Sequence, residues 1–198
     1  MLVSLKWLKD YVDIELTAEE LSHELTMAGL EVDEIKIIRP QFSGVVVAKI
    51  LSVKTHPSAD RLSLCSVSDG TQNYPVVCGA NNIVPGDIVP LAKVGAVIPG
   101  GYTIKSSVLR GEKSDGMLCS ESELEIGDDA SGIMHLPSDL PLGLPLDTAL
   151  NIGDTVFDVG VTPNRSDCLS MIGMAREVAA ITGKKIKQPS LKIMLISN

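Results

Sequence analysis

The stretch HPSADRLSLCSV (residues 56–67) predicts two β-strands joined by a tight corner. Pro57 fixes φ at the corner, and the side chains of Ser58 and Asp60 can hydrogen-bond nearby backbone N–H groups. The residues that follow take up strand spacing and leave Arg61 pointing outward. We therefore expect Asp60 to hold the corner and Arg61 to be available to a ligand.

The same stretch also contains residue types that bind metals or catalyse reactions, namely His56, Asp60 and Cys65. Structural zinc sites usually show paired ligands at CxxC-like spacing, and the cysteines of this chain are widely separated. Cys65, Cys78 and Cys119 each lie in an apolar run, where a free cysteine behaves as a small hydrophobic residue. We therefore expect buried thiols, no metal site and no catalytic residue.

The composition limits the class of protein. Hydrophobic residues make up 44% of the 198 residues and aromatic residues only 3%, so the core must be aliphatic. No run approaches the roughly 18 apolar residues of a membrane span. The first sixteen residues, MLVSLKWLKDYVDIEL, carry charges throughout and contain no apolar leader segment. We expect a cytoplasmic protein with reduced thiols and no membrane partner.

The net charge of −8 at first argues against a nucleic-acid partner. The charge is unevenly distributed, however, because residues 44–116 hold seven basic and five acidic side chains while 121–129 hold five acidic ones. A local basic face on an acidic chain is therefore compatible with the sequence, without a strong basic field.

Periodicity divides the chain into three parts. Thr17 and Glu20 form a capping-box pattern at the start of a helix that Gly29 can end, and residues 30–38 alternate as in a strand. Short β-rich runs separated by turn residues fill 44–120, which favours a small sandwich or barrel. A strand and then a helix are expected between residues 154 and 183.

Each flank has about forty residues, too few to fold alone without metal or disulfides. We expect 1–39 and 151–190 to form one small discontinuous α/β domain. A five-stranded OB-fold β-barrel over 40–150 is expected to be inserted into it, so the fold class is α+β. Residues 191–198 are expected to start a truncated following domain.

Four segments, in order, resemble the OB-fold tRNA-binding domain that several aminoacyl-tRNA synthetases carry: HPSADRLSLCSV (56–67), VCGANNI (77–83), GAVIPGG (95–101) and LRGEKSDGMLCSESEL (109–124). The flanks (1–35 and 162–184) resemble the bacterial phenylalanyl-tRNA synthetase beta subunit. Ser58 and Arg61 stand where that family more often has Asn and Lys. The acidic EIGDD (125–129) also departs from what strong tRNA binding favours.

The resemblance implies a non-catalytic N-terminal part of a phenylalanine–tRNA ligase beta chain, which adds accessory tRNA binding to aminoacylation of tRNA(Phe) during translation. It implies an ATP-dependent, Mg²⁺-using ligase in the full complex, with no cofactor in this fragment. The implied partners are tRNA and the alpha subunit, in a heterotetramer of two alpha and two beta chains, and not DNA. A free-standing structure-specific tRNA-binding protein and a subunit-interaction domain with little RNA contact are the alternatives.

Recognition of folded tRNA through its backbone is expected rather than base stacking, because 40–150 contain only Phe42, Tyr74 and Tyr102 as aromatic residues. The candidates for phosphate or 2′-OH contact are Lys54, Arg61, Lys105, Arg110, Lys113 and Ser114.

Asn164 and Arg165 form a further notable pair. We expect a structural turn in which Arg165 pairs with Asp158 or Asp167. A nucleic-acid or subunit contact is the alternative.

Overall fold

The computed structural model describes residues 1–187, which divide into two compact units. One unit joins Met1–Arg39 to the chain from Gly153 onward, and the other is Pro40–Ile152. The segment 191–198, expected to start a following domain, lies outside the described residues.

The helices of the first unit begin at polar caps. In α1 (Leu5–Tyr11), the side chain of Ser4 accepts a hydrogen bond from the backbone N–H of Trp7 at 2.9 Å. In α2 (Ala18–Met27), Thr17 and Glu20 form the predicted capping box, which satisfies two backbone N–H groups that the helix leaves unpaired. The helix at 17–29 is thereby confirmed.

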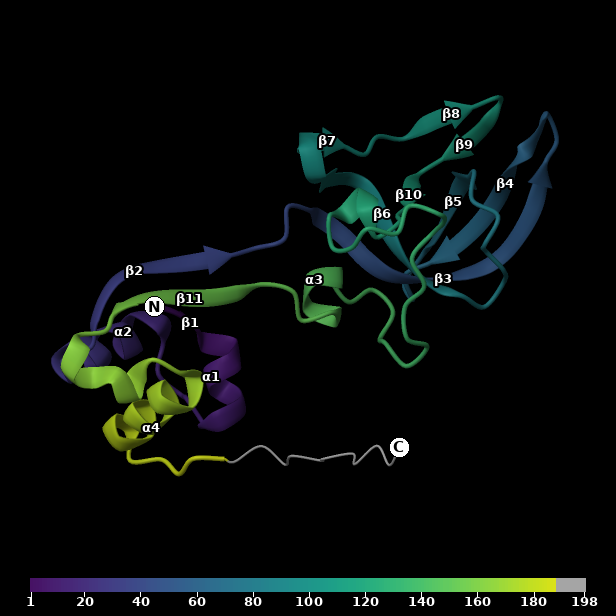
Figure 1. The fold of residues 1–198 in the computed structure, drawn as a ribbon. Coiled ribbons are helices and arrows are strands. Elements are labelled where there is room, and N and C mark those ends of the chain that lie inside the picture. Colours follow the sequence, from purple (N-terminus) through teal and green to yellow (C-terminus); the bar gives the residue numbers. More distant parts are fainter. Residues whose placement is uncertain (188–198) are drawn as a thin grey trace, which may run out of the picture. The chain divides into compact units, whose positions relative to one another are not determined.

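A three-stranded antiparallel sheet joins the two ends of this unit, in the order β1 (Leu2–Ser4), β11 (Asp154–Gly160) and β2 (Glu31–Ile38). The central strand comes from the later segment and its neighbours from the earlier one (Figure 1). The predicted second helix is α4 (Met171–Thr182), capped by Ser170 and ended by Gly183 at φ +66°. Its apolar side packs with Leu8, Leu25 and Phe157 in one hydrophobic core.

The second unit is built from antiparallel strands. Its main sheet has the order β10, β6, β3, β4, β5, with β7 paired to β6, and β8 and β9 form a separate hairpin. The strands are β3 (Ser43–His56), β4 (Ala59–Ser68), β5 (Asn73–Cys78), β6 (Ile88–Ile98), β7 (Tyr102–Thr103), β8 (Ser107–Leu109), β9 (Glu112–Ser114) and β10 (Gly116–Leu118).

The chain is thus a mixed α and β structure with antiparallel sheets. The edge strands β5 and β10 are not paired with each other, so the main sheet does not close into a barrel through strand pairing. Single hydrogen bonds connect the two edges instead: the Asp115 N–H donates to the Pro75 carbonyl at 2.7 Å, and the Val77 N–H donates to the Ser114 hydroxyl at 3.1 Å.

Glycine is required where β10 meets β6. Gly116 has φ +151°, and a Cβ at this position would lie 2.9 Å from the Ala92 carbonyl oxygen. A larger residue would therefore push β10 away from the sheet.

Short helices complete the chain: η1 (Pro99–Gly101), η2 (Ser122–Leu124), α3 (Leu146–Ala149) and η3 (Pro163–Cys168). Within residues 1–187, no helix is both long enough and apolar enough to cross a bilayer.

Candidate nucleic-acid interface

The predicted strand–corner–strand element is the hairpin of β3 and β4, whose turn is Pro57–Ser58. His56 is the residue that holds this corner. Its ring is 3% exposed, and Nδ1 accepts a hydrogen bond from the Ser58 N–H at 3.0 Å. The expectation for Asp60 is wrong, because its carboxylate is exposed and makes no hydrogen bond with the residues that the structure describes.

The same ring joins a second hairpin to the first. His56 Nε2 lies 3.2 Å from the carbonyl oxygen of Leu109, at the end of β8. Because Nδ1 accepts from a backbone N–H, the proton of the neutral ring is on Nε2, which therefore donates to Leu109. The turns of the β3–β4 and β8–β9 hairpins are thus held side by side (Figure 1). His56 is buried, so its ring holds the two turns together and is not exposed to an external ligand.

The turn between β8 and β9 places an exposed arginine, Arg110, in a strained backbone conformation. Leu109 and Glu112 are paired, so the loop consists of Arg110 and Gly111 alone, with φ +51° and +96°. Two-residue hairpin loops with positive φ at both positions favour Asn-Gly. An arginine in the left-handed region has a backbone cost, and its side chain stands exposed at the tip.

Four candidate cations are exposed and form no ion pair within residues 1–187: Lys54, Arg61, Lys105 and Arg110. Lys54 lies two residues before His56, and Arg61 lies two residues after Ala59, the residue that pairs with His56. The linked hairpin turns therefore collect Lys54, Arg61 and Arg110 at one end of the unit.

The remaining candidates, Lys113 and Ser114, interact with other residues of the protein. The Lys113 ammonium lies 2.6 Å from the Asp115 carboxylate, although its side chain stays 63% exposed. Ser114 is 3% exposed, accepts a hydrogen bond from the Val77 N–H and donates to the Gly116 carbonyl. Its hydroxyl connects the edges of the sheet, so the expectation of an RNA contact is corrected for Ser114.

The aromatic residues offer no stacking surface of several rings. Phe42 is buried at 7% exposure, and the Tyr74 hydroxyl donates to a carboxylate oxygen of Asp69 at 2.9 Å. Tyr102, by contrast, is 64% exposed.

Sequence reasoning missed a buried polar cluster around Asp69, in the turn between β4 and β5. One carboxylate oxygen accepts hydrogen bonds from the Thr71 N–H, the Thr71 hydroxyl and the Gln72 N–H. The other accepts from the Tyr74 hydroxyl and, at 3.1 Å, from the Lys93 ammonium of β6. Burial by itself would raise the pKa of Asp69, but these hydrogen bonds outweigh burial and hold the pKa well below its usual range. The Asp-Gly pair at 69–70 signals the turn but not its link to β6.

Asn164 and Arg165 lie in η3. The Asn164 side chain is exposed and forms no hydrogen bond among residues 1–187. The Arg165 guanidinium pairs with Asp167 at 3.2 Å and with Glu177 of α4 at 2.8 Å. Asp158 pairs instead with Lys36 and the N-terminal amine.

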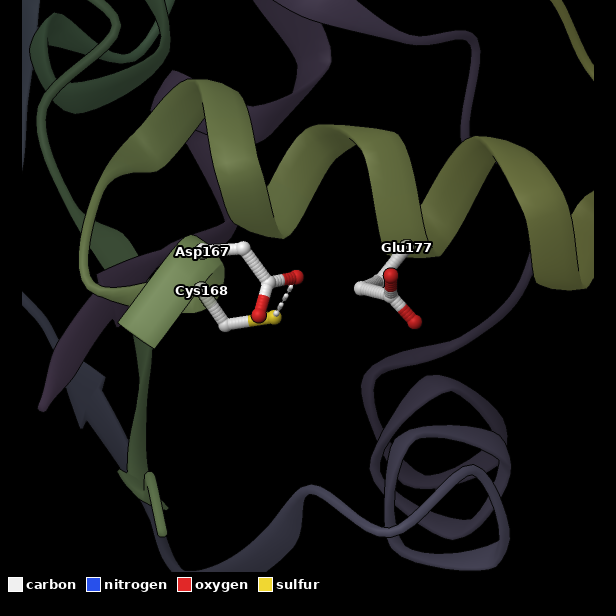
Figure 2. Close-up of side chains that lie close together, drawn as sticks. All are labelled: Asp167, Cys168 and Glu177. Carbon is white, nitrogen blue, oxygen red and sulfur yellow. Dashed lines mark hydrogen bonds between the residues drawn. The ribbon is translucent and has the colours of Figure 1, made fainter. Parts of the chain in front are cut away.

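Within the described chain, one set of potential metal ligands gathers three residues, shown in Figure 2: Asp167, Cys168 and Glu177. Arg165 Nη2 contacts all three side chains, lying 2.9 Å from the Cys168 sulfur. The guanidinium therefore takes the position that a bound cation would need. Burial, followed by the hydrogen bond to Asp167, raises the pKa of Cys168 to about 11, so the thiol stays protonated.

The other cysteines are buried as predicted. Burial raises the pKa of Cys65 and that of Cys119 to about 12. Since the thiolate is the nucleophile, such thiols are inert at neutral pH.

Comparisons with known proteins give the family to which the chain is similar. Residues 45–145 match the family model described as putative tRNA binding domain. Over 193 residues, the chain is 62% identical to the phenylalanine–tRNA ligase beta subunit of Syntrophus aciditrophicus, covering 98% of this chain and 24% of that protein. It is 52% identical over 189 residues to the protein of the same name from Geobacter sulfurreducens, covering 96% and 24%. The chain thus spans about a quarter of the length of these relatives.

Solved structures give weaker matches. A MetRS-related protein from Pyrococcus horikoshii matches with a TM-score of 0.39 and 15% identity, over 67% of this chain and 98% of that one. The C-terminal domain of Plasmodium vivax p43 matches with a TM-score of 0.37 and 21% identity, over 50% and 56%.

Proposed function

Because the chain belongs to the family described as putative tRNA binding domain, we propose that its Pro40–Ile152 unit binds tRNA through the phosphate backbone. The observation that carries the proposal is the pair of hairpin turns joined by His56 and Leu109. Exposed, unpaired guanidinium and ammonium groups at these turns can meet phosphates without first breaking an ion pair.

The proposed context is an accessory, non-catalytic part of a phenylalanine–tRNA ligase beta chain, acting in aminoacylation of tRNA(Phe) during cytoplasmic translation. It is supported by relatives of that name, which match both units of the chain and not the tRNA-binding segment alone. In this context, ATP and Mg²⁺ serve other parts of the complex. The alpha subunit is the proposed protein partner, in an assembly of two alpha and two beta chains.

We also propose that β3, β4, β5, β6 and β10 correspond to the five strands of an OB-type barrel. The hydrogen bonds from Asp115 to Pro75 and from Val77 to Ser114 would then mark the seam between its edge strands. In OB folds, nucleic acids bind near the loop between the first two strands and the loop between the last two. These loops would be the β3–β4 turn and the segment that contains β8 and β9.

Two alternative functions remain to be tested against this proposal. A free-standing tRNA-binding protein would not need the first unit, whose residues the ligase relatives also match. A subunit-interaction domain with little RNA contact is favoured by the internal pairing of Lys93 and Lys113 and by the five acids in 121–129.

The test is charge reversal at the interface. The double variant Arg61→Glu with Arg110→Glu should bind bulk tRNA at least about tenfold more weakly at moderate salt, because phosphate attraction becomes repulsion. The matched control is Lys9→Glu with Lys185→Glu, which makes the same change in net charge on exposed residues of the other unit. Filter-binding titration gives the affinities, and thermal melting checks folding. An equal loss in both variants, or no loss in either, would contradict the proposed interface.

A further inference from the structure

A pocket of about 370 Å³ lies in the Pro40–Ile152 unit, where the end of β5 meets the segment after β10. Its walls come from residues 77–80, from 117–123 and from the loop 130–133. The first two walls belong to the motifs VCGANNI and LRGEKSDGMLCSESEL. The volume falls at the lower end of the roughly 300–1,000 Å³ that is usual for small-molecule sites.

Internal contacts fix the pocket walls. The side chain of Asn82 forms two hydrogen bonds with the backbone of Ile133, donating to its carbonyl at 2.8 Å and accepting from its N–H at 2.9 Å. On the opposite wall, Cys78 is paired with Ser63 of β4. Contacts within the protein therefore hold both walls of the pocket in place.

The Glu123 carboxylate at the pocket is held in position through one of its two oxygens. Glu123 Oε2 accepts hydrogen bonds from the Ser120 N–H at 2.7 Å and from the Ser120 hydroxyl at 2.9 Å. Glu123 Oε1 accepts none from residues 1–187. Ser120 thus fixes the carboxylate and leaves one oxygen able to accept from a ligand.

The other lining residues select against a phosphate. No lysine, arginine or histidine is among the pocket-lining residues, all of which the structure describes, and Leu118 and Ile133 supply apolar surface. A neutral or cationic ligand group that offers an N–H donor to Glu123 therefore fits this lining best.

The pocket is also connected to both hairpins of the proposed interface. A Cβ on Gly79 would lie 3.7 Å from Leu62, the neighbour of Arg61 in β4. Val77, on the same wall, is hydrogen-bonded to Ser114 at the end of β9. Glu123 is exposed and lies at the pocket mouth. Cations at the hairpin turns and a carboxylate at the pocket mouth match a nucleotide whose phosphate stays at the turns while its base enters the pocket.

We propose that this pocket holds one unstacked guanine base of the tRNA bound at the hairpin turns, an inference that rests on the proposed function. Proteins read single-stranded RNA by hydrogen bonds to the Watson–Crick edge of splayed-out bases. On that edge guanine carries two adjacent donors, N1–H and the 2-amino group, which can both approach Glu123 Oε1. In uracil, carbonyl oxygens flank the single N3–H and face the carboxylate unfavourably.

Free nucleosides test this assignment on the 198-residue chain without any phosphate contact. Guanosine, inosine and uridine are titrated while the NMR signals of the Gly79, Ala80 and Gly132 amides are followed. We expect guanosine to bind about tenfold more tightly than uridine, since a charge-assisted hydrogen bond is worth a factor of this order, with inosine in between. Equal binding of all three, no binding, or preferential binding of N-acetylarginine amide would overturn the proposal.

Variants separate the pocket from the phosphate contacts. Glu123→Gln keeps an oxygen for Ser120 but turns an NH₂ group toward the ligand, so it should remove the guanosine preference; Glu125→Gln, outside the pocket, should not. Ser131→Trp should fill the pocket and Ser138→Trp, on another exposed loop position, should not. If Arg61→Glu with Arg110→Glu abolishes tRNA binding while Glu123→Gln and Ser131→Trp behave as their controls, tRNA binding stands and the guanine pocket is refuted. If the pocket variants lose guanosine while charge reversal leaves tRNA binding intact, the pocket stands and the phosphate interface is refuted.

Discussion

At the scale of single residues, His56 determines the geometry of the candidate interface because its ring contacts two hairpins at once. It spans 53 positions of sequence to reach Leu109. Local patterns cannot reveal such a contact, since turn chemistry around Pro57 explains the corner equally well with Asp60 as the holding group.

We predict that His56→Ala lowers the free energy of unfolding by about 1–3 kcal/mol, because a buried ring and both of its hydrogen bonds are lost. Asp60→Ala should change it by less than about 0.5 kcal/mol, as for an exposed residue without partners. Urea denaturation measures both values. A larger effect from Asp60→Ala than from His56→Ala would mean that the corner is held as the sequence first indicated.

Asp69 leads to a pH-dependent prediction at the same scale. A carboxyl whose pKa is lowered on folding adds stability that is present above its unfolded pKa of about 3.9 and lost as the pH falls toward the folded pKa. Asp69→Asn should therefore destabilise the protein at pH 7, because an NH₂ group would face the Tyr74 hydroxyl and the Lys93 ammonium.

The measurement for Asp69 is thermal melting of the wild type and Asp69→Asn between pH 7 and pH 2. The gap between the two melting temperatures should narrow as the pH falls below about 4. A gap that stays constant over this range would show that ionised Asp69 does not stabilise the fold. Asp139→Asn is the control, since Asp139 is exposed and forms no hydrogen bond in the described part of the chain.

At the scale of elements, the β8–β9 hairpin keeps a charged residue in a turn position that suits asparagine. This conflict between Arg110 and its backbone conformation is explained if the guanidinium serves binding at the expense of stability.

We predict that Arg110→Asn stabilises the protein by up to about 1 kcal/mol, because Asn-Gly suits a two-residue loop with positive φ at both positions. The same change should weaken tRNA binding severalfold. Arg110→Lys is the matched control and should keep binding without the gain in stability. If Arg110→Asn binds tRNA as well as the wild type does, the strained arginine has no role in the interface.

At the scale of the whole molecule, the sequence predicted elements better than it predicted contacts. The capping box at Thr17, the helix ended by Gly183 and the burial of the cysteines follow from local signals, and the structure confirms them. The pairing of Arg165 with Glu177, the inward hydroxyl of Ser114 and the link from Asp69 to Lys93 depend on how separate segments pack. Periodicity within one segment carries no information about these partners.

The central claim is that the linked hairpin turns hold tRNA by its phosphates, and the salt dependence of tRNA binding tests it most directly. For the wild type, the logarithm of the association constant should fall linearly with the logarithm of the salt concentration. Arg61→Gln with Arg110→Gln should make that slope shallower by between about 1 and 2, since each phosphate contact contributes about 0.7–0.9. A slope near zero in the wild type, or an unchanged slope in the double variant, would contradict the account.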